Sequence, residues 1–265
     1  MTSSSLSKER LFAHVGYSPH VGQLEVHSSC AKYRALAGGS RWGKTTLVLH
    51  EVLAALLKPG GDSRGLLLAY DQGQASAGWA ALALKLRQHF SHRLLGASER
   101  RRVLSVQNLA GGLSSCTIGC WSRSRDLLDG HLDWLIVDGG FPAPDVNESN
   151  GRWTSLFDEV GHQLIAGTPT AGGDWFEAAF QHIADIAGGA SWSRPAWENP
   201  VVSRSSLDGE RRRLGEDEFW RFHGGEFIPA TGRVCPACGW GARVGDRLLS
   251  FGDWDGCRPC PECER

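Results

Sequence analysis

The chain has 265 residues, which is long enough for one good-sized α/β domain and a small appendage. Its content of 41% hydrophobic and 22% charged residues is ordinary for a soluble globular protein. The net charge of -1 excludes a global electrostatic attraction to nucleic acid or anionic membranes, so any contact with DNA must come from local basic patches.

The N-terminal stretch MTSSSLSKERLFAHVGYSPH lacks the apolar core of a signal peptide. The longest apolar run, LVLHEVLAALL, is interrupted by His50 and Glu51 and is too short to span a bilayer. We therefore expect a cytoplasmic protein with no membrane partner. Residues 1–228 alternate apolar strands with helical patterns, which predicts a parallel sheet, whereas residues 229–265 form a separate segment rich in Cys, Gly and Pro.

The stretch YRALAGGSRWGKTTLVLHEVLAALL contains the pattern G-x-x-x-x-G-K-[ST], formed by Gly38, Gly43, Lys44 and Thr45. An apolar segment precedes the pattern and a helical pattern follows it. The glycines allow backbone N–H groups to face phosphates, and the helix N-terminus adds positive potential. We expect Lys44 to reach the β- and γ-phosphates, Thr45 to ligate Mg²⁺, and Thr46 to add a further nucleotide contact.

Two later strands predict further parts of the same site. In LDWLIVDGG, residues 134–137 form a buried strand and Asp138 follows at its carboxyl end, where it is placed to hold Mg²⁺. A simple turn at Asp-Gly is the alternative. In HQLIAGTPTAGG, Thr168 follows a third strand and is a candidate sensor of the γ-phosphate, although GTP is equally a turn sequence.

The last stretch, CPACGWGARVGDRLLSFGDWDGCRPCPEC, contains five cysteines in CxxC pairs. Cys235-x₂-Cys238 followed by Cys257-x₂-Cys260 has the spacing of a four-cysteine zinc ribbon. Cys263 completes a further CxxC and could replace Cys257 or Cys260 as a ligand. Disulfides or free thiols are the alternatives. Because such a segment has too small a core to fold alone, zinc would supply its folding energy.

In this order the motifs resemble those of the ATPase domain of the large terminase subunit of tailed phages, over roughly residues 15 to 228. Tyr17, Pro19 and Gln23 match the pattern of that family's adenine-recognition segment. The stretches that carry the resemblance are GYSPHVGQLEVHSS, AGGSRWGKTT, LLLAYDQGQA, LLDGHLDWLIVDGG, LIAGTPTAGGDWFEAAF, ENPVV and FWRFHGGEFI.

The resemblance implies that ATP and Mg²⁺ are bound by a ring of subunits around double-stranded DNA, with other terminase subunits and the capsid portal as partners. It implies an adenine contact for Gln23, a catalytic role for Arg41 within the phosphate loop, and a coupling role for Thr168. If the chain is phage-encoded, it would act in the cytoplasm of the host cell.

One departure from the family concerns the residue after Asp138. The family has an acid there that orients or deprotonates the attacking water, whereas this chain has Gly139. Loss of a general base costs about 10²- to 10⁴-fold in rate, so we expect hydrolysis to be slow or absent unless another group acts. Asp145, Glu148, a residue of a neighbouring subunit, or a neutral group that holds the water are candidates.

A second departure concerns the C-terminus, where the family carries a nuclease domain built on acidic residues that hold metal ions. Only 37 residues follow Ile228, too few for that fold, so we expect that this chain does not cut DNA by itself and that any nuclease lies on another polypeptide.

The sequence thus predicts a three-layer α/β P-loop NTPase with a mainly parallel sheet over residues 1–228, and a small C-terminal zinc ribbon over residues 229–265. The leading function is an ATP-hydrolysing DNA-packaging motor subunit. The alternatives are a catalytically impaired nucleotide-binding assembly or regulatory subunit, and another P-loop DNA translocase. Arg123 and Arg125 are candidate arginine fingers at a subunit interface, and the basic runs at 99–102, 122–126 and 210–218 fit a solvated surface or a DNA contact.

Overall fold

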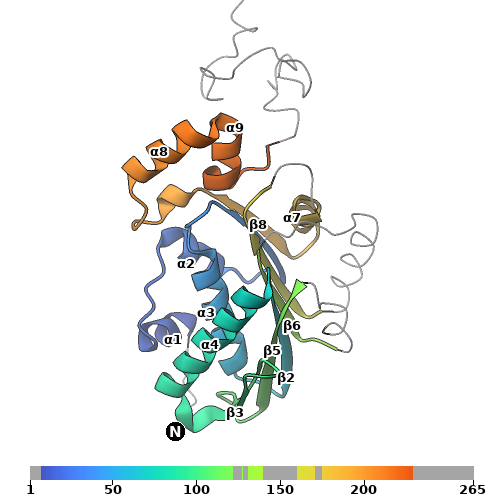
Figure 1. Ribbon diagram of the computed structural model, residues 1–265. Coiled ribbons are helices and arrows are strands. Elements are labelled where there is room, and N and C mark those ends of the chain that lie inside the picture. The colour runs from blue at the N-terminus through green and yellow to red at the C-terminus, as the bar shows by residue number, and fades with distance from the viewer. Residues whose placement is uncertain (1–6, 122–126, 128–130, 140–159, 171–174, 229–265) are drawn as a thin grey trace, which may run out of the picture.

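The computed structural model describes residues 7–121, 127, 131–139, 160–170 and 175–228. Its strands are β1 (Tyr33–Gly38), β2 (Ser63–Ala69), β3 (Leu94–Ser98), β4 (Val103–Gln107), β5 (Leu113–Cys120), β6 (Trp134–Asp138), β7 (His162–Gly167) and β8 (Gly189–Arg194). They form one sheet in the order β3-β4-β5-β2-β6-β7-β1-β8 (Figure 1). Six strands run parallel, and β3 and β4 form an antiparallel edge, so the predicted mainly parallel sheet is confirmed.

Helices cover both faces of the sheet, which gives the predicted three layers (Figure 1). The α-helices are α1 (Lys8–His14), α2 (Val21–Ser28), α3 (Lys44–Leu57), α4 (Gln72–His89), α7 (Trp175–Asp185), α8 (Arg204–Leu214) and α9 (Glu216–Phe219). Short helical turns are η1 (Ser91–Arg93), η3 (Ala196–Glu198) and the π-helical η4 (Trp220–Gly224). Among the described residues, none of these helices combines the length and apolar character needed to cross a membrane.

Side chains along the central strands point alternately to the two faces of the sheet, so the hydrophobic core is divided into two clusters. On one face, side chains such as Leu36, Leu67 and Ile136 pack against α3 and α4. On the other face, their strand neighbours, such as Leu66 and Leu135, pack against α7. Because successive residues of a strand point to opposite faces, strands that are covered on both sides need continuous apolar runs, and the central strands have them.

The parallel register aligns the carboxyl ends of three strands. Asp138 of β6 lies opposite Ala166 of β7, and Ala37 of β1 lies opposite Gly167 of β7. The segments that leave β1, β6 and β7 therefore start at the same edge of the sheet, where ligands bind in open α/β folds.

A buried carboxylate, Glu51 of α3, joins three elements on the helical face. Its oxygens accept hydrogen bonds from Lys8 (2.8 Å) and Arg34 (2.7 Å). Burial lowers the pKa of His27, so its neutral ring donates from Nδ1 to Glu51 at 2.6 Å, while Nε2 accepts from the Tyr17 hydroxyl at 3.1 Å. The surrounding positive groups hold the pKa of Glu51 far below its usual range although burial opposes this. This cluster fixes α1, α2 and β1 to α3.

We expect Glu51→Gln to lower the free energy of unfolding by about 3–5 kcal/mol, because the buried guanidinium of Arg34 loses its counter-charge. Urea unfolding at pH 7 measures the change. The exposed Glu9→Gln in α1 is the matched control and should change stability by less than about 0.5 kcal/mol. A loss for Glu51→Gln no larger than that of the control would show that the cluster contributes little.

Candidate functional site

The loop between β1 and α3 curls around the side chain of Lys44. Gly43 has φ 103°, a left-handed conformation that favours glycine, and it begins α3 without a side-chain cap. The Lys44 ammonium donates to the carbonyl oxygens of Gly38 at 2.8 Å and Gly39 at 2.9 Å. A helix start with free N–H groups and a lysine beside it can bind a phosphate.

Asp138, Thr45 and Lys44 form the polar centre of the site. Asp138 ends β6 and is 8% exposed, and its carboxylate hydrogen-bonds with the side chain of Thr45. Burial raises the pKa of Asp138, while Thr45 and the charge of Lys44 oppose the rise. Burial also lowers the pKa of Lys44 to about 8, against the opposing charge of Asp138. A hydroxyl next to a carboxylate supplies the oxygen ligands that Mg²⁺ prefers.

Thr168 follows β7 and contacts the phosphate loop directly. Its hydroxyl donates to the carbonyl oxygen of Gly38 at 3.1 Å. The same oxygen accepts from the ammonium of Lys44, so the two side chains share one acceptor. Any movement of Lys44 towards a phosphate would therefore change the hydrogen bonding of Thr168.

Gln23 lies under the loop, on the first turn of α2. Its amide nitrogen donates to the carbonyl oxygen of Gly43 at 3.0 Å, and its amide oxygen accepts from the backbone of His20 at 3.1 Å. Gln23 is 4% exposed. The side chain thus supports the loop and caps α2, a structural task that the sequence did not reveal.

Trp42 within the phosphate loop has a set of partners that the sequence also did not predict. Its indole is fully buried and donates to Glu198 at 2.9 Å, and its carbonyl oxygen lies 3.0 Å from Nε2 of His20. Because Nδ1 of His20 accepts from the backbone of α2, Nε2 carries the proton and donates. Arg194 at the end of β8 donates to Glu198 at 3.2 Å. The sequence signal that could have indicated these contacts is the large side chain of Trp42 within the phosphate-loop pattern.

Arg41 and Thr46 lie on the solvent side of the loop. Arg41 is exposed and has φ 67°, which is uncommon for a residue other than glycine. Its carbonyl oxygen accepts from the side-chain amide of Asn199 at 2.7 Å, so the segment after β8 holds the loop at this point. Thr46 is also exposed.

Gly139, directly after Asp138, has φ 125° and donates its N–H to Ala166 at 2.8 Å. L-residues rarely adopt this conformation, so a side chain here would be strained. At the position where the resembled family has an acid, this chain therefore has a bend of the backbone that glycine makes possible. The other groups expected to assist hydrolysis, Asp145 and Glu148, lie outside the described residues.

Several further predicted residues also lie outside the described part of the chain. They are the candidate arginine fingers Arg123 and Arg125 and the candidate zinc ligands Cys235, Cys238, Cys257, Cys260 and Cys263. Within the described residues, no group of three or more His, Cys, Asp or Glu side chains is arranged to hold a metal ion.

Two phage proteins are similar to this chain in sequence. The large terminase subunit of Thermus virus P23-45 is 27% identical over 226 residues, which is 80% of this chain and 45% of that protein. The large terminase subunit of Thermus phage G20c is 29% identical over 186 residues, or 65% of this chain and 38% of that protein. The chain thus spans less than half the length of these curated relatives. No protein-family model matches it.

Solved terminase structures share the fold. The large terminase ATPase domain of Thermus phage P74-26 has a TM-score of 0.66 at 24% identity, covering 83% of this chain and 98% of that one. The HK97 bacteriophage large terminase has a TM-score of 0.59 at 13% identity, covering 83% and 55%. The large terminase of a thermophilic bacteriophage in complex with ADP has a TM-score of 0.58 at 18% identity, covering 79% and 54%. The described α/β domain therefore has the fold of a large terminase ATPase domain.

We expect Gly139→Ala to lower the free energy of unfolding by about 1–3 kcal/mol, because a Cβ is strained at φ 125°. The matched control is Gly209→Ala within α8, where an added Cβ meets no atom within 4 Å, and which should raise stability by about 0.5–1 kcal/mol. Thermal and urea unfolding of the three proteins measure both effects. Equal effects of the two substitutions would contradict a strained turn at Gly139.

Proposed function

We propose that this chain is the ATP-binding motor part of a phage DNA-packaging terminase. The observation that carries the proposal is that four side chains lie together where β1, β6 and β7 end at the same edge of the sheet. They are those of Lys44, Thr45, Asp138 and Thr168. The sequence similarity to two large terminase subunits and the shared ATPase-domain fold support it.

In this proposal each side chain has a distinct task at the nucleotide. Thr45 and Asp138 would hold Mg²⁺, which would neutralise phosphate charge, and Lys44 would bind the β- and γ-phosphates together with the backbone N–H groups at the start of α3. Asp138 is buried, so its charge acts more strongly on a bound ion than it would in water.

Four residues have supporting tasks in the proposal. Thr168 couples the state of the nucleotide to β7, because its hydroxyl shares an acceptor with Lys44. Arg41, exposed at the loop, acts on the phosphate charge. Thr46 adds a nucleotide contact, and Gln23 contacts adenine while it holds the carbonyl of Gly43.

A second candidate function is a nucleotide-bound assembly or regulatory subunit with little turnover. The observation that favours it is the backbone of Gly139, whose φ of 125° does not suit a glutamate in the usual place of the catalytic acid. In this second proposal the chain binds nucleotide but hydrolyses it slowly, since the proposed nucleotide ligands Lys44, Thr45 and Asp138 are all present while the acid after Asp138 is not.

The proposal extends to organisation and partners. Residues 1–228 would form the motor domain and residues 229–265 a zinc ribbon with four of the five tail cysteines as ligands. Double-stranded DNA, other terminase subunits, the capsid portal and further copies of the chain in a ring would be partners. Metal analysis of the undenatured protein tests the ribbon, and a zinc content near zero would reject it.

We expect ATP hydrolysis by the purified protein to rise when duplex DNA is added and to fall at least about 100-fold in Lys44→Ala. A phosphate-release assay measures both rates. The control is Lys85→Ala on α4, which should leave the rate unchanged.

Three outcomes separate the two candidate functions. ATP hydrolysis that is lost in Lys44→Ala supports the motor function and implies that a residue other than Gly139 positions the attacking water. Tight ATP binding without turnover in the presence of DNA supports the assembly or regulatory subunit. Absence of ATP binding rejects both. Gly139→Glu adds information only if its unfolding curve matches that of the unmodified protein, because the substitution also strains the turn.

We expect the affinity for ATP to be constant below about pH 8 and to weaken above it. Burial lowers the pKa of Lys44 to about 8 in the free protein, and a bound phosphate favours the protonated form. Deprotonation of the free protein therefore reduces affinity by up to about tenfold per pH unit above this value. Titration with a fluorescent ATP analogue between about pH 6.5 and 9.5 measures the profile, and Lys44→Met should bind weakly without this dependence. A flat profile in the unmodified protein would contradict the role of Lys44.

A further inference from the structure

Residues 39–42 of the phosphate loop are each hydrogen-bonded to the segment that begins at the end of β8. Their partners are the carbonyls of Arg194 and Phe222, the side-chain amide of Asn199 and the carboxylate of Glu198. The four donor–acceptor distances lie between 2.6 and 2.9 Å. The middle of the loop is therefore shaped by residues that come much later in the sequence.

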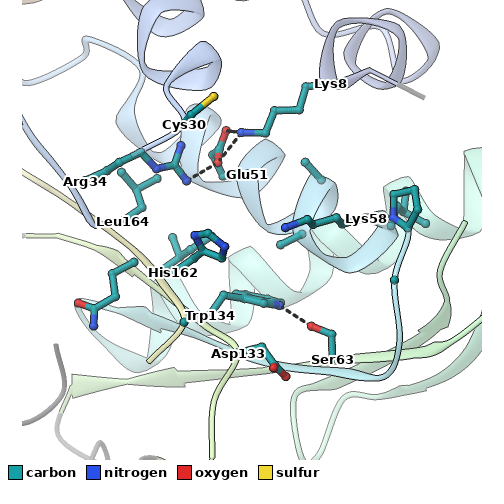
Figure 2. A pocket seen from close by; sticks show the side chains of 18 of the residues that line it. Lys8, Cys30, Arg34, Glu51, Lys58, Ser63, Asp133, Trp134, His162 and Leu164 are labelled. Carbon is teal, nitrogen blue, oxygen red and sulfur yellow. Dashed lines mark hydrogen bonds and ion pairs between the residues drawn. The ribbon is translucent and has the colours of Figure 1, made fainter. Parts of the chain in front are cut away.

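The two ends of the loop are fixed in a different way. The loop follows β1 and precedes α3, and Glu51 of α3 is paired with Arg34 of β1 at 2.7 Å. Figure 2 shows this pair and the pair of Glu51 with Lys8, in the wall of a pocket at the amino ends of β6 and β7. Because these pairs hold the flanking elements, the bonds from the segment after β8 act mainly on the course of residues 39–42.

Arg41 is the residue of the loop for which such a bond matters most. Its φ of 67° lies in the left-handed region, which residues other than glycine seldom adopt. Its carbonyl oxygen accepts from Nδ2 of Asn199 at 2.7 Å, and this bond opposes a return of the backbone to a more common conformation. The direction in which the exposed side chain of Arg41 leaves the loop depends on that backbone.

Asn199 is itself held so that its amide nitrogen faces the loop. Its Oδ1 accepts from the backbone of Val201 at 3.1 Å, which leaves Nδ2 for the carbonyl of Arg41. Its backbone N–H donates to Ala196 at 3.1 Å. Pro200 restricts the residue before it to the extended region, and Asn199 has ψ 114°. The Asn-Pro sequence thus presents an oriented donor to the loop.

The carboxylate next to Asn199 does not compete with a phosphate for Arg41, because both of its oxygens are engaged elsewhere. One oxygen of Glu198 accepts from the indole of Trp42 at 2.9 Å, and the other accepts from Arg194 at 3.2 Å. The group of this segment that bonds to Arg41 is therefore a neutral amide.

We infer that Asn199 is a positioning residue of the nucleotide site, which sets the preference for a nucleoside triphosphate over a diphosphate by holding Arg41. The inference rests on the proposed function, in which Arg41 acts on the phosphate charge. A cation whose direction is already fixed loses less freedom when it binds an oxyanion. Because the attraction grows with the charge of the ligand, Arg41 favours ATP, which carries one phosphate group more than ADP.

The test compares the affinities of the full chain for fluorescent analogues of ATP and ADP in the presence of Mg²⁺. We expect Asn199→Ala to weaken binding of ATP about fivefold to tenfold and binding of ADP less than about twofold, because the contact of Arg41 is made with the triphosphate. Asn199→Asp should weaken ATP further, since a carboxylate oxygen then faces the carbonyl of Arg41. The control is Val201→Asp, which adds the same charge at an exposed position of the segment and should change both affinities by less than about twofold.

A double-mutant cycle separates the positioning of Arg41 from a general effect on the loop. Arg41→Ala should weaken ATP about tenfold. Asn199→Ala should add less than about twofold in the Arg41→Ala background, because no guanidinium is left to position. Near-ultraviolet circular dichroism checks that each variant is folded. Asn199→Ser, whose hydroxyl can keep the turn with Val201, takes the place of Asn199→Ala if the latter is unfolded.

The outcomes distinguish failure of the inference from failure of the proposed function. Equal weakening of ATP and ADP, or an undiminished effect of Asn199→Ala in the Arg41→Ala background, would show that Asn199 only shapes the loop and would overturn the inference. Unchanged ATP affinity in a folded Asn199 variant would overturn it while the proposed function stands. Absence of ATP binding by the unmodified protein would reject both.

Discussion

The candidate site depends on the parallel register of β1, β6 and β7, which brings the carboxyl ends of these three strands to the same edge of the sheet. A parallel ladder fixes which residues lie opposite one another, so Asp138 lies opposite Ala166 while Ala37 lies opposite Gly167. Three chain segments that are far apart in sequence therefore leave the sheet at one edge. The helix that follows β1 must then start at the same edge, and the buried ion pair between Glu51 and Arg34 of β1 holds that helix against the sheet.

The phosphate loop is held from outside as well as by its own sequence. Residues from α2 and from the segment after β8 contact it through Gln23, through Trp42 with Glu198, and through Asn199. Its backbone also joins η4, because the N–H of Ser40 donates to the carbonyl of Phe222 at 2.6 Å. In the proposed function, a loop fixed on several sides would keep its shape when a phosphate binds, so little binding energy would be lost in ordering it.

Local patterns predicted the α/β fold and the grouping of Lys44, Thr45 and Asp138, because the physical causes lie within a few residues. The spacing of Gly43 and Lys44 specifies a strand, a turn of positive φ and a helix start, and the structure has all three. The buried strand of residues 134–138 was equally clear from its apolar run. The antiparallel β3–β4 edge, the Glu51 cluster and the structural task of Gln23 were not predictable, because each depends on pairing between segments whose separation in sequence carries no periodic signal.

The conformation of Gly139 connects the sequence departure to the chemistry of the site. If a glutamate had simply been lost, the backbone at this position would suit any residue, but φ is 125°. The N–H of Gly139 donates to Ala166 of β7, which is the last ladder bond between β6 and β7, and the chain bends at Gly139. Asp138 keeps its partner Thr45 and its charge interaction with Lys44. In the proposed function, the bend at Gly139 therefore leaves in place the residues that would hold Mg²⁺ and phosphate, and alters only the position from which water would be activated. If the chain hydrolyses ATP as proposed, the group that activates water would come from a segment other than the end of β6, and the rate would depend on how that segment is placed.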